Sequence, residues 1–198
     1  MRKYKLRVLT IFVCLFIFQA NILFAATLKG AIESRKLRRN MSNIVVCLKP
    51  KDSLEIKLPP INPMMDQRRL EFIPHVLPVA IGSTVDFLNN DSTKHNIFSP
   101  SDVADKFDFG YYAPGQKRSH TFRKPGHAAL LCNKHDEMLA YVYVCESHLF
   151  TKTDKKGNYE LNNVPPGDYE AKIWHKRLKI YKQDISIANE VVLDLKLK

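Results

Sequence analysis

The chain has 198 residues and a formal net charge of +11, from 31 basic and 20 acidic residues. This length allows one domain or two small ones. Short apolar runs separated by glycine and proline fill the sequence, and long segments with a helical period of 3.6 residues are missing. These features exclude a helical bundle and favour an all-β protein of the sandwich type.

The first 25 residues have the pattern of a secretory signal peptide. The segment begins with four basic residues, Arg2, Lys3, Lys5 and Arg7. An apolar run from Val8 to Phe18 follows, and Phe24-Ala25-Ala26 ends in small residues. The run is shorter than the about 20 residues of a membrane helix. We therefore predict cleavage near Ala25/Ala26 and export to the periplasm, with an uncleaved N-terminal anchor as the alternative.

Cleavage there would leave a basic mature protein. It removes four basic residues and no acidic ones, so the formal charge falls from +11 to +7. A basic exported protein is drawn to acidic surfaces. We expect an acidic redox partner or an anionic membrane face, no nucleic acid partner, and no integral membrane span after cleavage.

Three cysteines remain after cleavage: Cys47, Cys132 and Cys145. An odd number of cysteines in an oxidising compartment leaves at least one thiol without a disulfide partner in the same chain. We assign Cys132 to a metal. Cys47 and Cys145 each lie in a β-like run, and the sequence leaves open whether they form a disulfide or remain buried free thiols.

The flanking regions have strand patterns of their own. We expect strands near 27–32 and 43–49, separated by the charged turn Ser34–Arg39, which we interpret as a solvated loop, with a docking patch as the alternative. In the tail, alternation in Tyr169–Ile173 and Val191–Leu197 predicts half-buried strands of an antiparallel sheet.

Between these flanks, residues 99–126 are expected to be mostly loop. Phe107–Gly115 is aromatic and rich in turn residues, and Ser119–Phe122 is expected to form a short strand.

A possible metal-ligand set lies in Cys132-Asn-Lys-His135-Asp-Glu-Met138, which Val-rich and Tyr-rich flanks place in a loop between strands. His95 lies upstream, after a polar loop. Taken singly, such residues are more often a surface histidine, a buried thiol or a core methionine. Together they match a blue-copper site, in which two His and one Cys form a trigonal plane with a weak axial Met. A structural zinc site would use four Cys or His ligands.

At this point the residues match a family. The pattern Phe122-x3-Gly126-x5-Cys132-x2-His135-x2-Met138 resembles the C-terminal copper loop of the cupredoxins, with the short spacing of amicyanin rather than plastocyanin. The stretch 79–96 resembles the segment that supplies the first histidine in that family.

The resemblance covers about residues 64–146 and implies a Greek-key β-sandwich. It implies one type 1 copper with the ligands His95, Cys132, His135 and Met138. It also implies that Asn96, which follows the first ligand, hydrogen-bonds across to the cysteine loop. The acidic pair Asp136-Glu137 departs from the family pattern, in which this edge is apolar.

The tail resembles a second family. Thr153-Asp-x2-Gly157-x-Tyr159, followed by Val164-Pro-Pro-Gly167-x-Tyr169, is similar to the carboxypeptidase regulatory-like, transthyretin-type β-sandwich. This resemblance implies that the copper domain, 64–146, is inserted between two parts of that module, 27–62 and 147–198. Chains of this kind resemble bacterial plastocyanin-like or methylamine-utilisation proteins. This resemblance implies a redox function but does not define a substrate.

Together these features predict a periplasmic blue-copper protein that is not an enzyme and carries single electrons. The chain has no Cys-x-x-Cys-His haem motif, so we expect a separate partner such as a c-type cytochrome or a periplasmic dehydrogenase. The alternatives are a copper carrier or scavenger and a non-catalytic binding module. A Cys132 nucleophile with a histidine base is a weaker option.

Overall fold

The computed structural model describes residues 25–38, 40–52, 62–101 and 106–198, so the predicted signal peptide lies outside it except for its last residue. Within these ranges the chain forms seventeen strands and one short 3-10 helix, which confirms the all-β prediction. None of the helical structure in the described ranges is long and apolar enough to cross a membrane.

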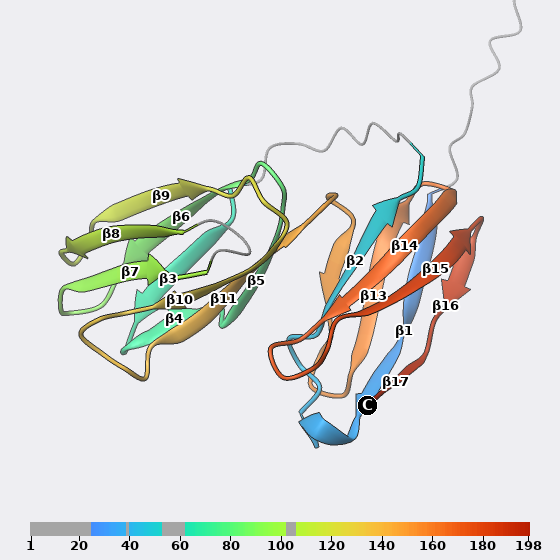
Figure 1. Ribbon diagram of the computed structural model, residues 1–198, viewed down its shortest axis with the longest axis horizontal. Helices are drawn as coiled ribbons and strands as arrows, with labels where there is room; N and C mark the ends of the chain where they lie inside the picture. The colour runs from blue at the N-terminus through green and yellow to red at the C-terminus, as the bar shows by residue number, and fades with distance from the viewer. Residues whose placement is uncertain (1–24, 39, 53–61, 102–105) are drawn as a thin grey trace, which may run out of the picture.

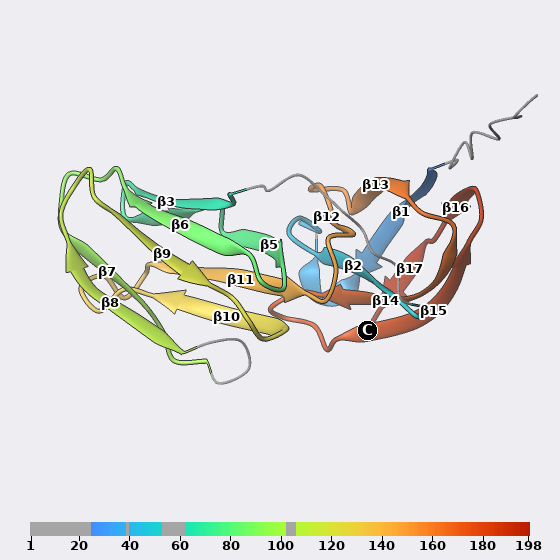
Figure 2. The same cartoon turned by 90° about the horizontal axis from the view of Figure 1, so that it is seen from above.

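The strands form two β-sandwiches that lie side by side (Figures 1 and 2). The central sandwich uses β3 to β11. Its five-stranded sheet has the order β5 (Val76–Ala80), β11 (Leu139–Cys145), β10 (Gly126–Leu131), β7 (His95–Ser99) and β8 (Phe107–Tyr112). Its four-stranded sheet has the order β4 (Glu71–Ile73), β3 (Met64–Arg68), β6 (Thr84–Asn89) and β9 (Lys117–Thr121).

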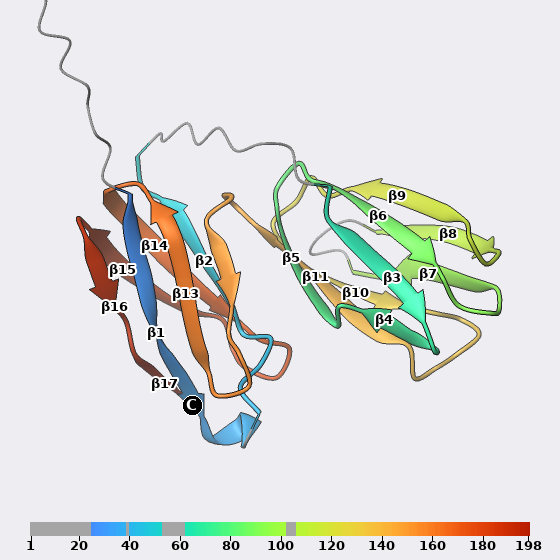
Figure 3. The same ribbon diagram turned by 180° about the vertical axis from the view of Figure 1, so that it is seen from behind.

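The terminal sandwich combines the two flanks of the chain. One sheet has the order β13 (Asn158–Val164), β1 (Ala26–Ser34) and β16 (Glu190–Val192), with β17 (Leu195–Leu197) also paired to β1. The other has the order β12 (Phe150–Lys152), β2 (Val45–Pro50), β14 (Gly167–Trp174) and β15 (Tyr181–Ile187). The 3-10 helix η1 (Arg35–Leu37) follows β1. Figure 3 shows β1 and β13 crossing the terminal sandwich side by side.

Each sandwich has its own apolar core, because alternate residues of the strands point inward. In the central sandwich, Val85 and Phe87 of β6 pack in one cluster with Val142 and Val144 of β11. In the terminal sandwich, a separate cluster contains Leu28 of β1 and Tyr169 of β14. Burial of such side chains contributes about 1.5–3 kcal/mol each, so each core can hold its two sheets together.

A third cluster joins the two sandwiches. It contains Val45, Cys47, Val76, Tyr143, Cys145 and Trp174. Cys47 and Cys145 form a disulfide with a Cα–Cα distance of 6.0 Å, which settles the alternative that the sequence left open. The rings of Tyr143 and Trp174 stack with centroids 4.8 Å apart. The two bodies are therefore joined both covalently and by aromatic packing.

Two expectations about strands were wrong. Residues 107–112 form the edge strand β8 rather than a loop. Phe107 and Phe109 alternate as strand residues do, while Gly110, with a φ of +63°, donates its N–H to the Asp108 carboxylate at 2.8 Å. The turn-like composition reflects this local irregularity, which coincides with a shift of register in the β7–β8 pairing.

The last strands are parallel to β1, not antiparallel. Gly30 explains how the final segment fits, since a Cβ there would lie 2.1 Å from the carbonyl oxygen of Leu193. At this point Leu193 donates its N–H to Lys29, and the Asp194 carboxylate accepts the N–H of Ala31 at 2.8 Å. The Asp194 side chain thus takes the place of a backbone ladder partner, and this separates β16 from β17.

The disulfide should contribute strongly to stability. It closes a loop with a sequence separation of 98 residues, and a loop of about 100 residues corresponds to at most about 4.7 kcal/mol of chain entropy. We expect Cys47→Ser/Cys145→Ser to lower the free energy of unfolding in urea by about 2–4 kcal/mol. Chemical reduction of the wild-type protein should give a similar loss. An unchanged unfolding midpoint in both cases would contradict the role of this bond.

Stability should also fall with acidification because of His175. Burial first, then the nearby charges of Lys176 and Arg177 and the His75 ring, lower its pKa to about 4, against about 6.5 in the unfolded chain. The unfolded state therefore binds the proton more readily between these values, so stability is lost as pH falls from about 6.5 to about 4. We expect His175→Gln to show a smaller loss than wild type in urea unfolding at pH 7 and pH 4.5. His148→Gln, at an exposed histidine, is the control, and an equal loss in all three proteins would contradict this assignment.

Candidate metal centre

The predicted ligands lie at the end of the central sandwich that is remote from the terminal sandwich. His95 is the first residue of β7, and Cys132–Met138 form the loop between β10 and β11. The strand β11 starts directly after this loop with Leu139 and ends six residues later at Cys145 of the disulfide. At about 3.3 Å per residue, roughly 20 Å separate the two ends of the strand.

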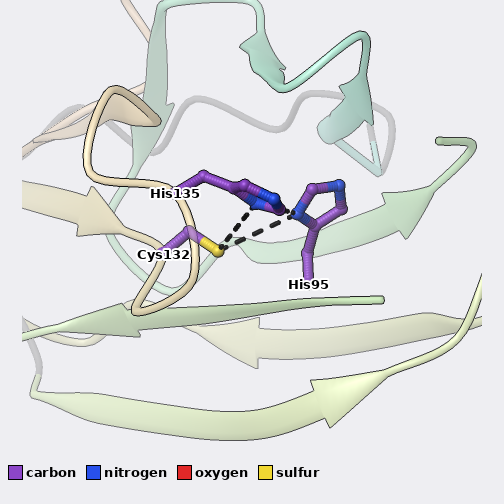
Figure 4. A group of neighbouring side chains, drawn as sticks. All are labelled: His95, Cys132 and His135. Carbon is purple, nitrogen blue, oxygen red and sulfur yellow. Dashed lines mark hydrogen bonds between the residues drawn. The ribbon is translucent and has the colours of Figure 1, made fainter. Parts of the chain in front are cut away.

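Three of the predicted ligands converge there (Figure 4). Cys132 Sγ lies 3.8 Å from Nδ1 of His95 and 3.8 Å from Nδ1 of His135. The two Nδ1 atoms are 3.0 Å apart. His95 is fully buried, Cys132 is 4% exposed, and His135 is partly exposed. Two imidazole nitrogens and a sulfur therefore point at one common space.

The size of this space fits a metal ion. A triangle with these three sides has a centre about 2.1 Å from each corner, close to the metal–nitrogen distance of ~2.0–2.1 Å and the metal–sulfur distance of ~2.3 Å known for zinc proteins. The three groups form the one cluster of potential ligands found among His, Cys, Asp and Glu in the described ranges. The N₂S donor set is the trigonal set of blue-copper sites.

Met138, the fourth predicted ligand, is buried and lies in the same loop as two of the three converging residues. Its side chain is 1% exposed and belongs to the same core cluster as Cys132. Its backbone N–H donates to the carbonyl of His135 at 3.0 Å, which closes the ligand loop into a tight turn. The turn holds the backbone of Met138 against that of His135, and its thioether is the candidate for the weak fourth ligand of such a site.

Asp91 fixes the orientation of His95, and the sequence analysis did not single it out. Its Oδ2 lies 3.0 Å from Nε2 of His95, so Nε2 carries the proton and Nδ1 is left free to bind a metal. The carboxylate also accepts N–H groups from Leu70 and Ser92, both at 2.8 Å. An acid four residues before the histidine was the available signal, but polar loops often contain such acids without this role.

The electrostatics keep this pair in the required protonation states. The hydrogen bond from the Leu70 N–H is the largest influence on Asp91, and with those from Ser92 and His95 it lowers the pKa to about 2. Burial lowers the pKa of His95, and the Asp91 carboxylate opposes this only in part. Near neutral pH, Asp91 is therefore charged and His95 is a neutral imidazole, the form that binds metals.

Two buried asparagines hold the surrounding loops. Asn96 Oδ1 accepts the N–H of Asn133 at 2.8 Å, which is the expected contact across to the cysteine loop. Asn89 donates to the carbonyls of Thr93 and Tyr112 at 3.0 and 3.1 Å, and its Oδ1 accepts the N–H of Asp91. Both side chains are at most 1% exposed. The ligand positions are thus set by hydrogen bonds within the chain.

The fold and the site define a class of protein: a two-sandwich β protein with a cysteine–histidine cluster that could hold a metal ion at one end. Residues 61–151 match the model of the copper-binding proteins of the plastocyanin/azurin family. This segment is a cupredoxin domain, which confirms the resemblance for this part of the chain. The family match also supports copper binding by this domain. The similarity of the terminal sandwich to the carboxypeptidase regulatory-like module stays a prediction.

Solved structures include similar chains. The copper-containing nitrite reductase of Thermus scotoductus SA-01 is 24% identical, with a TM-score of 0.42, over 50% of this chain and 26% of its own, so the match spans about a quarter of that enzyme. A purple cupredoxin from Nitrosopumilus maritimus is 22% identical, with a TM-score of 0.38, over 42% of this chain and 99% of its own. A reduced amicyanin mutant is 22% identical, with a TM-score of 0.40, over 50% and 97%. A comparison with curated protein sequences finds no match.

The role of Asp91 can be tested by removing its carboxylate. We expect Asp91→Ala to bind Cu(II) about 10–100-fold more weakly in competition with a chelator, because His95 loses its orienting partner. Asp136→Ala is the matched control, since it removes the same charge from an exposed residue next to His135. Equal affinities for Asp91→Ala and wild type, or an equal loss in the control, would contradict an orienting role.

Proposed function

We propose that this protein is an exported type 1 copper protein that carries single electrons between separate redox partners. The observation that carries the proposal is the convergence of His95 Nδ1, Cys132 Sγ and His135 Nδ1, at mutual distances of 3.0 and 3.8 Å. Bound copper would supply one-electron Cu(II)/Cu(I) chemistry at this donor set.

The protein's own residues are arranged for such a function. A ligand set fixed by Asp91, Asn96 and the two strands resists rearrangement when the charge of the site changes, which favours fast electron transfer over ligand exchange. His135 is partly exposed, whereas His95 and Cys132 are buried. His135 is therefore the edge of the site closest to solvent, and we propose it as the route to a partner.

The surface beside this edge carries mixed charge. Asp136 and Glu137 are exposed next to His135, and Lys134 donates its ammonium group to the hydroxyl of Thr93 at 2.8 Å. Charged groups at an interface favour particular partners and speed encounter at low salt. This mixed composition supports a partner recognised in part by charge, such as a c-type cytochrome or a periplasmic dehydrogenase.

The alternative is a copper carrier that holds Cu(I) without redox turnover. The same soft ligands would bind that ion. The buried, hydrogen-bonded positions of His95 and Cys132 favour retention of the metal, which suits an electron carrier better than a protein that must release its cargo. We therefore propose the carrier of electrons, with no enzymatic reaction of its own and with export directed by residues 1–25.

The first test is the visible spectrum of the mature protein loaded with Cu(II). We expect one copper per chain and an intense thiolate-to-copper band that Cys132→Ser abolishes, because the sulfur is lost from the donor set. The Cys47→Ser/Cys145→Ser variant should keep the band, which separates the ligand thiol from the structural pair. A colourless protein, or one that binds only Cu(I) or Zn(II), would contradict the type 1 assignment.

Electron transfer itself is tested by mixing the copper-loaded protein with a reduced c-type cytochrome in a stopped-flow instrument. One electron per copper should be accepted and the band should bleach, with a rate that depends on ionic strength. If the band persists with every chemically competent electron donor, the proposed electron transfer is contradicted. Copper carriage would then be the better-supported function.

A further inference from the structure

The charge of the mature chain is divided very unevenly between the two sandwiches. Residues 62–146 contain nine basic and ten acidic residues, a net charge of −1. The flanks, 26–61 and 147–198, contain eighteen basic and ten acidic residues, a net charge of +8. The copper domain is thus close to neutral, and the excess positive charge belongs to the flanks that build the terminal sandwich.

Within the terminal sandwich the charge gathers at one end. The β17 pairing sets Leu197 opposite Ser34, and Met41 donates its N–H to the carbonyl of Lys155, so three segments meet there. Figures 1 and 3 show η1, the C-terminus and the β12–β13 turn at this end. We call it the basic end, and its exposed basic residues are Arg35, Lys36, Arg38, Lys155, Lys156 and Lys198.

The basic end is a fixed surface rather than a loose tail. Leu37, in the middle of the charged turn, is 5% exposed and belongs to the core of the terminal sandwich. Gly157 fits closely under the same turn, since a Cβ there would lie 2.2 Å from the carbonyl oxygen of Ile32. Arg35, Lys36 and Arg38 are exposed to solvent, as the sequence predicts, but they are displayed from an anchored frame.

Little acidic charge offsets the basic end. Glu33 approaches Lys196 at 3.9 Å, with both side chains largely exposed, which makes this a weak pair. The Asp154 carboxylate accepts the backbone N–H groups of Lys156 and Asn158, so its hydrogen bonds stabilise the turn in which it lies. Such one-sided charge costs stability through repulsion, and an external anionic surface would relieve it.

The β14–β15 turn extends this surface toward the central sandwich. It contributes Lys176, Arg177 and Lys179, all exposed, followed by Ile180 and Tyr181, which are 51% and 37% exposed. An apolar and an aromatic side chain between lysines is the composition of segments that rest at a membrane–water interface.

We infer that the basic end docks on an anionic membrane surface, with lipid headgroup phosphates as the groups recognised. Lysine and arginine side chains spread over separate turns suit a broad layer of negative charge, to which each adds about tenfold or less in affinity. The metal centre lies on the other sandwich, at the end remote from the terminal sandwich, so the basic end does not include His135. An acidic protein is the competing occupant of the same surface.

The test uses the mature full chain without added copper, so that its outcome is independent of the proposed electron transfer. Binding is measured by co-sedimentation with vesicles of phosphatidylcholine containing phosphatidylglycerol, and with pure phosphatidylcholine, at about 0.1 M salt. We expect binding to the anionic vesicles alone, weakened at higher salt. Lys155→Glu/Lys156→Glu should weaken it at least about thirtyfold, and Arg35→Glu/Lys36→Glu similarly.

The matched control is Lys106→Glu/Lys124→Glu, which makes the same charge change on exposed residues of the central sandwich. It should lose much less affinity than either basic-end variant. Equal losses in all three variants would show attraction by net charge only and overturn the inference. So would an absence of vesicle binding, or binding of a soluble acidic polypeptide by the basic end in preference to the vesicles.

Discussion

The strand β11 is buried on both faces, and much of the structure depends on how those faces are filled. Ala140, Val142 and Val144 pack into the core of the central sandwich, while Tyr143 and Cys145 enter the cluster between the sandwiches. One end of the strand continues from the metal-ligand loop and the other ends in the disulfide. A single strand therefore links the metal centre, the copper-domain core and the second body.

The metal centre is held mainly by hydrogen bonds that the chain makes with itself. The polar side chains around it are buried, which would be costly if they were unpaired. Asn89 ties the loop that carries Asp91, Asp91 orients His95, and Asn96 holds the loop that carries Cys132. The contact of Asn96 with Asn133 and that of Asp91 with Leu70 join segments 37 and 21 residues apart, so the ligand positions depend on the folded sandwich as well as on local turns.

The sequence was informative where a pattern is local. Alternation predicted the strands near 169–173 and 191–197, and Cys132-x2-His135 with His95 upstream predicted the three residues that meet in the site. The sequence was less informative where pairing partners decide the outcome. The parallel pairing of the last strands depends on the space left by Gly30, and the disulfide depends on how the two sandwiches dock. The role of Asp91 likewise depends on a turn, at Leu70, that lies 21 residues away.

The account depends most on the claim that the folded chain presents two imidazoles and one thiolate as a preformed ligand set. X-ray absorption spectroscopy at the copper edge, on the oxidised and the reduced protein, tests this directly. We predict two nitrogen ligands and one short sulfur ligand in both states, with little change in their distances on reduction. A site without the short sulfur ligand, or one that loses a nitrogen ligand when it is reduced, would contradict the claim.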